Sequence, residues 1–360
     1  MSLFHINEDI SLAETLPSEF YTNEKYFELS KDKIFSRTWQ YAGDMEEARV
    51  AGQIHPFYLL ENFLDEPLML SRDKNDTLHC LSNVCTHRGN IIIEGNCIEK
   101  NIICRYHGRR FDLNGKFLLM PEFNEVKNFP SKTDNLPRIP FNTWQKFLFV
   151  SLNPISPVQH FIGEMCSRMS WLPLNEFVFD SSRSRDYLVK AHWALYCENY
   201  LEGFHIPYVH NSLSAALDYS SYKTELYKFS SLQTGVAKSG EDCFDFPKNS
   251  TDFGQKISAF YFWIFPNTMF NFYPWGLSIN VIKPVKPDLS KVSFITYVWD
   301  ESKLDKGAGA GLDKVEREDE AIVENVQRGI NSRSYNRGRY SVKRETGTHH
   351  FHRLIAEFIS

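Results

Sequence analysis

The sequence has no long hydrophobic run, no block of basic residues and no internal repeat. A membrane-spanning helix needs about 20 apolar residues, so we expect the chain not to associate with a membrane. It carries 40 Lys and Arg against 45 Asp and Glu, and its net charge of −5 argues against nucleic acid as a partner. The N-terminal stretch MSLFHINEDISLAETLPSEF has no basic segment, so we expect no secretory signal and a cytoplasmic location.

Cysteine is also scarce, with 7 in 360 residues. A chain of this length buries a large core without disulfide bonds. In the cytoplasm, closely spaced cysteines bind metal more often than they form disulfides. Cys80 and Cys97 stand outside the paired motif described next, and we interpret them as small core residues.

Two cysteines stand in mirrored pairs with histidine, in CTHRGNIIIEGNCIEKNIICRYHG. Cys85 and His87 are separated by one residue, Cys104 and His107 by two, and a glycine follows each pair closely. Two thiolates and two imidazoles suit a [2Fe–2S] cluster in which the cysteines hold one iron and the histidines the other. Zinc is the alternative, but zinc fingers usually pair like ligands, whereas each pair here is mixed.

Residue patterning divides the chain into three parts and predicts an α+β fold. Residues 1–40 form a lead-in with an amphipathic helix in EKYFELSKDKIFSRTWQ. Residues 41–155 alternate short apolar runs with turn signals, including the hairpin signal Asn114-Gly115, and predict a small antiparallel β domain. Residues 156–360 mix long strands with helices, which we expect in HWALYCENYLEGFH up to Pro207, at about 312–330 and in HHFHRLIAEFIS.

A second group of candidate ligands lies in ENYLEGFHIPYVH, residues 198–210. Glu202 and His205 are three residues apart and would share one face of a helix, and His210 follows five residues later. Two imidazoles and one carboxylate form the facial triad that binds non-haem Fe(II) and leaves positions open for dioxygen. The carboxylate must come from another part of the chain.

Asp319 is the predicted third ligand. It falls on the apolar stripe of the helix in VEREDEAIVENVQRGI, where a carboxylate is costly unless it is paired or bound to metal. Glu320 is the next candidate. The stripe is predicted from Val315, Ile322, Val323, Val326 and Ile330. The other acids are expected mostly on the flanks or the solvent side of the helix: Glu316, Glu318, Glu320 and Glu324.

These motifs resemble a known family. CTHRG…CRYHG is similar to the Rieske cluster motif, and ENYLEGFHIPYVH resembles the mononuclear-iron motif of the Rieske non-haem iron oxygenases, specifically their catalytic α subunits. TLPSEFYTNEKYFELSKDKIFSRTWQYAG looks like their N-terminal lead, and EDEAIVENVQRG looks like the segment that supplies the aspartate ligand. The resemblance therefore covers nearly the whole chain.

The resemblance implies a Rieske domain followed by a helix-grip catalytic domain, in a homotrimer arranged head to tail. It implies that Cys85, His87, Cys104 and His107 hold a [2Fe–2S] cluster, and that an Fe(II) ion is bound by His205, His210 and Asp319. It assigns Glu202 and Asn199 to catalysis, since an acid at the position of Glu202 bridges the cluster of one subunit to the iron of the next. Electrons would come from NAD(P)H through a separate flavin-containing, iron–sulfur reductase, and the substrates would be O₂ and a small molecule.

Two departures bear on the substrate. The bridging acid is Glu202, where ring-dihydroxylating members usually carry Asp, and the interval from Asn199 to His205 is one residue shorter than in naphthalene-type enzymes. Glu at the bridge is similar to members that oxidise quaternary ammonium compounds such as carnitine, and the N-terminal lead looks like choline and betaine monooxygenases. We therefore expect hydroxylation or oxidative N-dealkylation of a small substrate, with arene dihydroxylation by a dioxygenase as the alternative.

The aromatic stretch AFYFWIFPNTMFNFYPWG, residues 259–276, leaves the pocket open to interpretation. Its rings could form a cage for a quaternary ammonium group, a slot for an arene, or one face of a core strand with Phe260, Phe262, Ile264 and Phe270. Two functions of other classes also remain. A plain Rieske electron carrier would need only about 110 residues of β domain, and a helix-grip binding protein would hold a purely structural metal.

Overall fold

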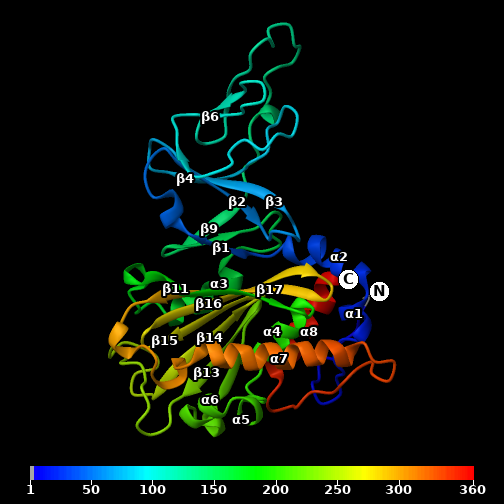
Figure 1. Ribbon diagram of the computed structural model, residues 1–360, viewed down its shortest axis with the longest axis vertical. Helices are drawn as coiled ribbons and strands as arrows, with labels where there is room; N and C mark the ends of the chain where they lie inside the picture. Colours follow the sequence, from blue (N-terminus) through cyan, green and yellow to red (C-terminus); the bar gives the residue numbers. More distant parts are fainter. Residues whose placement is uncertain (1–3) are drawn as a thin grey trace. The chain divides into compact units, whose positions relative to one another are not determined.

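The computed structural model describes residues 4–360 and divides the chain into two compact units (Figure 1). One unit runs from Gln40 to Pro154, and the other joins the residues up to Trp39 to Ile155–Ser360. The N-terminal segment is tied to the second unit, because Tyr21 donates a 2.7 Å hydrogen bond to Glu198 Oε1. Within the described part of the chain, no helix has the length and apolar character needed to cross a membrane. The structure confirms the predicted α+β class.

Three small antiparallel sheets form the unit at residues 40–154, with strand orders β1-β10-β9, β4-β3-β2-β5 and β6-β7-β8. Their strands are β1 (Gln40–Asp44), β2 (Gln53–Leu59), β3 (Glu66–Arg72), β4 (Leu78–Ser82), β5 (Cys97–Ile98), β6 (Ile102–Ile103), β7 (Arg110–Phe111), β8 (Phe117–Leu119), β9 (Phe141–Trp144) and β10 (Phe147–Val150). One apolar core cluster of this unit contains both Cys85 and Cys104. The loops that carry these cysteines are thereby anchored on packed side chains.

The hairpin at Asn114-Gly115 is confirmed, but its turn is longer than the two residues predicted. The Gly115 N–H donates to the Asp112 carbonyl at 3.0 Å, so that Leu113 and Asn114 form the centre of the turn. The Asp112 carboxylate accepts hydrogen bonds from the backbone of Asn114 (3.1 Å) and Lys116 (2.8 Å), which favours the wider turn. Gly115 then takes the left-handed position with φ of +85°.

A seven-stranded antiparallel sheet organises the second unit, with strand order β11-β17-β16-β15-β14-β13-β12. Its strands are β11 (Val178–Val189), β12 (Lys223–Leu226), β13 (Ser230–Val236), β14 (Ile257–Ile264), β15 (Thr268–Tyr273), β16 (Gly276–Lys286) and β17 (Leu289–Val298). The strands β13 to β17 pair in chain order, which places the aromatic stretch at 259–276 in the middle of the sheet.

The helices of this unit pack around the sheet. They are α1 (Ser18–Thr22), α2 (Glu24–Ser30), α3 (Gln159–Arg168), α4 (Trp193–Tyr200), α5 (Ile206–Val209), α6 (Asn211–Ala216), α7 (Leu312–Ile330) and α8 (Thr346–Ile359). Figure 1 shows the long helix α7 crossing one face of the sheet, and α4 contacts α7, α8 and β16. The predicted helices at 312–330 and at the C-terminus are confirmed.

The two faces of β14 and β15 have different surroundings. Phe260, Phe262, Ile264 and Phe270 are all at most 1% exposed and form a core face, as one of the sequence interpretations expected. Because successive side chains of a strand point to opposite faces, the alternate positions Tyr261, Asn271 and Tyr273 face the other way. These three line a cavity described below. The aromatic stretch therefore supplies core residues and pocket residues from the same strands.

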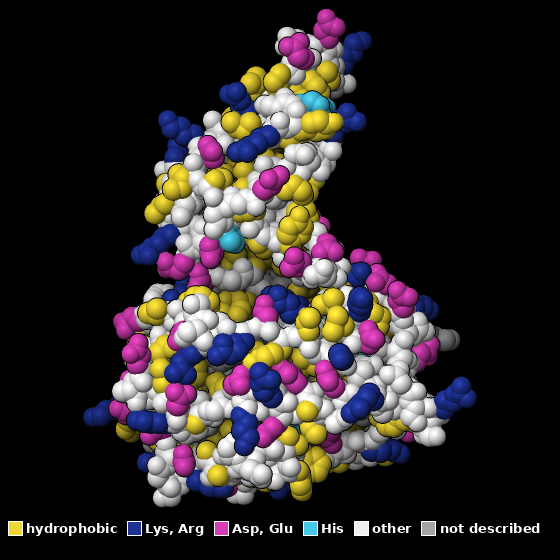
Figure 2. All heavy atoms as spheres, in the orientation of Figure 1, with side chains coloured by type: hydrophobic (Ala, Val, Ile, Leu, Met, Phe, Trp, Pro, Cys, Tyr) yellow, Lys and Arg dark blue, Asp and Glu magenta, His cyan; other side chains and the backbone are white. Residues whose placement is uncertain are grey.

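Charge is mixed on the surface around α7. Figure 2 shows basic and acidic side chains interspersed on this face of the unit, with no broad patch of one sign. Salt bridges along α7 account for part of this pattern, including Arg317 with Asp313 at 3.3 Å and Lys314 with the half-buried Glu318 at 3.8 Å. This face offers no basic surface of the kind that binds nucleic acid.

Candidate metal centres

The two cysteine–histidine motifs fold into matching turns. The Cys85 N–H donates to the Asn90 carbonyl at 2.8 Å, and the Gly89 N–H donates to the Cys85 carbonyl at 3.0 Å. In the second motif Cys104 pairs in the same way with Arg109 (2.9 Å) and Gly108 (3.0 Å). The same backbone pattern, used twice, presents one thiol and one imidazole from each loop.

Each turn depends on its glycine. Gly89 and Gly108 have φ of +70° and +74°, a left-handed conformation that other residues adopt only at an energetic cost. A Cβ on Gly108 would also lie 3.3 Å from Pro121 Cγ. The glycines that follow the two motifs in the sequence are therefore required by the backbone itself.

The four side chains converge in pairs of like kind. The imidazole rings of His87 and His107 are 4.9 Å apart, and the thiols of Cys85 and Cys104 interact with each other. Burial raises the pKa of Cys85, and the neighbouring Cys104 raises it further, so a metal must displace protons to be bound here. Although each loop carries a mixed pair, the fold puts sulfur beside sulfur and nitrogen beside nitrogen. That arrangement fits a two-iron cluster with unlike ends.

Cys80 and Cys97 take no part in this centre. Cys80 is 2% exposed within β4 and Cys97 is half-buried in β5, and both are free thiols packed against apolar side chains. The interpretation as a core residue is confirmed for Cys80, whereas Cys97 is only half-buried and packs against its cluster from outside.

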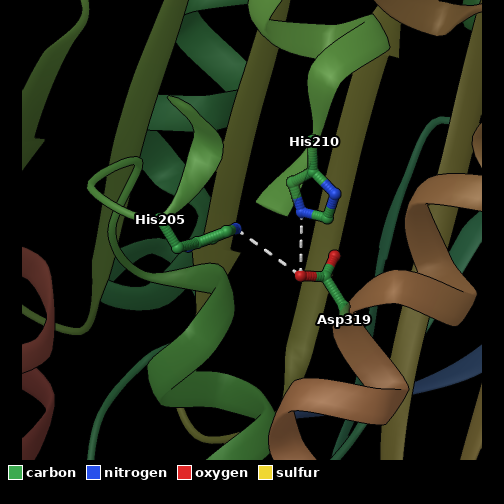
Figure 3. Close-up of side chains that lie close together, drawn as sticks. All are labelled: His205, His210 and Asp319. Carbon is green, nitrogen blue, oxygen red and sulfur yellow. Dashed lines mark hydrogen bonds and ion pairs between the residues drawn. The ribbon is translucent and has the colours of Figure 1, made fainter. Parts of the chain in front are cut away.

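The second centre joins His205, His210 and Asp319. One ligand atom from each lies within 4.8 Å of the others. Asp319 Oδ1 is 3.0 Å from His210 Nε2 and 3.5 Å from His205 Nε2, and Figure 3 shows both rings turned toward this carboxylate. The donor set fits a facial triad, since two imidazoles and one carboxylate approach one point and leave the cavity side open. Glu320, the next candidate in the sequence, is not part of this group.

A second carboxylate holds each imidazole from behind. His205 Nδ1 lies 2.7 Å from Glu202 Oε1, and His210 Nδ1 lies 2.8 Å from Glu318 Oε2. When Nδ1 carries the proton and donates it to a carboxylate, Nε2 keeps its lone pair for a metal. Burial opposes protonation of His210, but Asp319 and Glu318 outweigh burial and raise its pKa. Glu318 was expected on the periphery of the helix; it is half-buried and orients His210 instead.

The path of the chain between the ligands differs from the prediction. A single helix through Glu202 and His205, ended by Pro207, is wrong: α4 ends at Tyr200 and Pro207 stands in the first turn of the separate helix α5. Pro is tolerated there because the first N–H groups of a helix have no partner within it. The Glu202 carboxylate accepts the backbone N–H of His205 at 3.1 Å, just before α5.

Gly203 lies in the segment between the two helices and is closely packed. A Cβ at this position would lie only 2.7 Å from Cε1 of Tyr222, so the ring packs directly on the backbone. This contact places Tyr222 beside the segment that carries His205 and Glu202.

A cavity of about 100 Å³ opens beside the triad. The three proposed ligands, Glu202 and Asn199 all line it. Tyrosine dominates its walls, with Tyr196, Tyr200, Tyr222, Tyr261 and Tyr273. Burial raises the pKa of each of these phenols, so all of them are neutral. Among the described residues that line the cavity, none is Lys or Arg.

Glu316 also lines the cavity, and its position corrects the prediction for α7. The buried residues of this helix are Val323, Gln327 and Ile330, whereas Ile322 and Val326 are 36% and 43% exposed. The buried face is thus rotated from the predicted stripe, and Glu316 lies on it one turn before Asp319. Burial, together with nearby carboxylates, raises the pKa of Glu316 to about 8.

Comparison with known proteins adds the family. Residues 170–360 match the model of the ring hydroxylating alpha subunit catalytic domain, and residues 38–130 match the Rieske [2Fe-2S] domain. The chain is 29% identical to choline monooxygenase of Arabidopsis thaliana, with 95% of this chain and 82% of the relative covered. It is 28% identical to the carnitine monooxygenase oxygenase subunit of Escherichia coli K12, with 96% and 94% covered.

A solved structure shows the same fold. The quaternary ammonium Rieske monooxygenase CntA, in complex with gamma-butyrobetaine, superposes with a TM-score of 0.78 at 22% identity, covering 99% of this chain and 100% of that one. The catalytic-domain match covers more than half of the chain, and the Rieske match covers the cysteine–histidine motifs. The chain therefore belongs to the ring-hydroxylating α-subunit family. It is the terminal, oxidoreductase component of a Rieske-type oxygenase that uses a [2Fe–2S] cluster, a mononuclear iron and a separate reductase.

Proposed function

We propose that this oxygenase hydroxylates or oxidatively N-dealkylates a small quaternary ammonium compound. The observation that carries this proposal is the cavity beside the triad, whose walls combine five tyrosine rings with carboxylates and, within the described residues, no basic side chain. Tyrosine faces attract a quaternary ammonium group by cation–π interaction, and such a cage needs no hydrogen bond from its guest. The choline and carnitine monooxygenases among the relatives are named for substrates of this chemistry.

His205, His210 and Asp319 are proposed to hold the mononuclear iron, and Cys85, His87, Cys104 and His107 the cluster. When bound, the iron supplies the site for dioxygen and the cluster stores one electron. The protein orients the imidazoles through Glu202 and Glu318, and the aromatic walls keep water from the substrate. Asn199 lies on the cavity wall at the end of α4 and is proposed to contact substrate or dioxygen there.

Glu202 is proposed to pass electrons toward the iron from the cluster of a neighbouring copy in a trimer. Its side chain is 14% exposed and bonds to His205, so it can contact a ligand and a partner surface at once. Glu202→Gln should retain both metal signals and lose coupled turnover by about 100-fold or more. Full coupled activity in this variant would rule out the bridge. Sedimentation of the native protein as a monomer would rule out the trimer. The cytoplasmic location expected from the sequence stays a prediction.

The substrate is tested by oxygen uptake with the holoenzyme and a surrogate Rieske reductase. Choline, carnitine and glycine betaine are compared with benzene and naphthalene, and products are identified by mass spectrometry. We expect uptake coupled to hydroxylated or demethylated product only with the ammonium compounds. A cis-dihydrodiol from an arene would instead establish the second candidate function, that of an aromatic-ring dioxygenase. In that case the same tyrosine walls would form a flat slot for the arene.

A further inference from the structure

Glu316 lines two hollows of the catalytic unit. One is the tyrosine-lined cavity beside the triad, and the other is a neighbouring outer hollow that also contains Trp275 and Arg185. Ser278 and Leu312 are the two other residues shared by both. Glu316 therefore lies between the neighbouring hollow and the cavity beside the triad.

The carboxylate of Glu316 is poorly compensated. Among residues 4–360, none forms a hydrogen bond or salt bridge with it, and the charge of Arg185 offsets only part of the cost of its burial. Its other neighbours are acids and aromatic rings: Asp313, Asp319 and Glu320 repel its charge, and that charge acts on the phenols of Tyr196 and Tyr273. A carboxylate placed this way is costly for the folded protein, because burial disfavours a charge without a partner.

A cation in the cavity would relieve this cost. A trimethylammonium group has no N–H, so it gains from a nearby negative charge and from aromatic faces without a hydrogen bond. Glu316 offers the charge, and Tyr196 and Tyr273, which line the same cavity, offer aromatic rings. A neutral guest of the same shape would gain only from the faces. The position of Glu316 thus distinguishes a cation from its uncharged isostere.

We propose that Glu316 is the counter-ion of the substrate's ammonium group and sets the preference of this enzyme for cations over neutral molecules of the same shape. This inference rests on the proposed function and sharpens it, since it assigns the charge selectivity to one side chain of α7. The five tyrosines determine the shape of the cavity, and Glu316 determines its preference for a positively charged guest.

The test uses the iron-loaded holoenzyme and two probes of one shape: choline, and 3,3-dimethylbutan-1-ol, in which carbon replaces the ammonium nitrogen. Dissociation constants are measured by calorimetric titration at pH 9 for the native protein and for Glu316→Gln. We expect the substitution to weaken choline binding about ten-fold and to change binding of the alcohol by less than about two-fold.

Glu324→Gln is the matched control. Glu324 lies two turns further along α7, lines neither hollow and accepts a 2.9 Å hydrogen bond from the Lys190 N–H, which glutamine can also accept. It should leave both dissociation constants within about two-fold of the native values, although it removes the same charge.

The possible outcomes distinguish the role of Glu316 from the proposed substrate class. Native protein that prefers choline, together with an unchanged preference in Glu316→Gln, overturns the role of Glu316 and leaves the proposed function standing. An equal loss for choline and for the alcohol shows a role in shape only and also overturns it. Native protein that binds the alcohol as well as choline overturns the proposed substrate class itself.

Discussion

The two candidate metal centres of this chain are built in opposite ways. The cluster loops occupy residues 85–108, and each closes on itself through the same pair of backbone hydrogen bonds. The triad joins His205 and His210 to Asp319, 109 residues beyond the second histidine, and relies on side chains from separate elements. One centre is a local backbone motif used twice, and the other depends on the packing of helix α7 against its neighbours, chiefly α4.

This difference decides where each centre is vulnerable. A local turn fails when its own backbone conformation becomes unfavourable, whereas an assembled triad fails when a ligand or its orienting partner is lost. The following predictions test this contrast, from the largest expected effect to the smallest.

Asp319→Ala should abolish turnover, with a loss of at least about 1,000-fold, because two imidazoles alone do not complete the facial triad. Iron analysis should fall from about three to about two per chain, since the cluster is built independently. The visible and electron paramagnetic resonance signals of the cluster should persist. Glu320→Ala is the control and should keep all three irons; loss of iron there, with retention in Asp319→Ala, would exchange the roles of the two acids.

Gly108→Ala should act on the other centre. The left-handed φ of +74° and the nearby Pro121 make a Cβ costly by about 1–2 kcal/mol, which is concentrated in the loop that presents Cys104 and His107. Cluster absorbance per chain should fall severalfold, while mononuclear iron stays bound. Gly95→Ala in the same unit has open space and should change neither. Equal loss of the cluster and of the mononuclear iron would mean that the two centres are not independent.

Glu318→Ala should weaken the mononuclear site without removing a ligand. The variant leaves His210 Nδ1 without its 2.8 Å partner, and loss of such a partner typically costs about 10- to 100-fold in metal affinity. Competition with a ferrous chelator measures the change. Glu318→Gln retains an acceptor oxygen and should recover most of the affinity. Unchanged iron binding in the alanine variant would show that packing alone orients His210.

The smallest expected effect concerns pH and Glu316. Burial, aided by Asp313, Glu320 and Asp319 and opposed by Arg185, raises its pKa from 4.5 to about 8. Between these values the folded protein keeps a proton that the unfolded chain has released, so folding stability falls as pH rises and the penalty is complete above about pH 8. Metal-free Glu316→Gln should therefore melt a few degrees above the native protein at pH 9 and show little gain near pH 5. An equal gain in melting temperature at both pH values would show that the shape of the glutamine side chain, and not the loss of charge, stabilises the variant.

The parts of the structure that depend on local sequence were predictable. The cysteine–histidine spacing, the glycines of the cluster loops and the long strands follow from short stretches of residues. The three side chains that converge in the structure, His205, His210 and Asp319, could also be named, because an acid near the buried side of α7 stands out against its neighbours.

The errors lie where distant residues decide. The predicted helix through Glu202 is wrong, since α4 ends at Tyr200. The ring of Tyr222 packs on Gly203 in the segment that follows, and no pattern within 198–210 reveals that contact. Ile322 and Val326 predict a buried stripe, but both are exposed, and the buried positions of α7, whose main neighbour is α4, are Val323, Gln327 and Ile330. The sequence marks Glu316 only as a carboxylate one turn before Asp319, and the cavity that it lines is formed by residues distant in the sequence.

The alternation along β14 and β15 has a consequence for how this protein can change. Substitutions at Tyr261, Asn271 and Tyr273 alter the chamber, whereas Phe260, Phe262 and Phe270 maintain the sheet from the opposite side. New substrate ranges can therefore arise by substitution at every second position of β14 and β15, while the intervening residues keep the sheet stable. Libraries randomised only at these alternate positions should yield far more folded clones than libraries randomised in consecutive blocks.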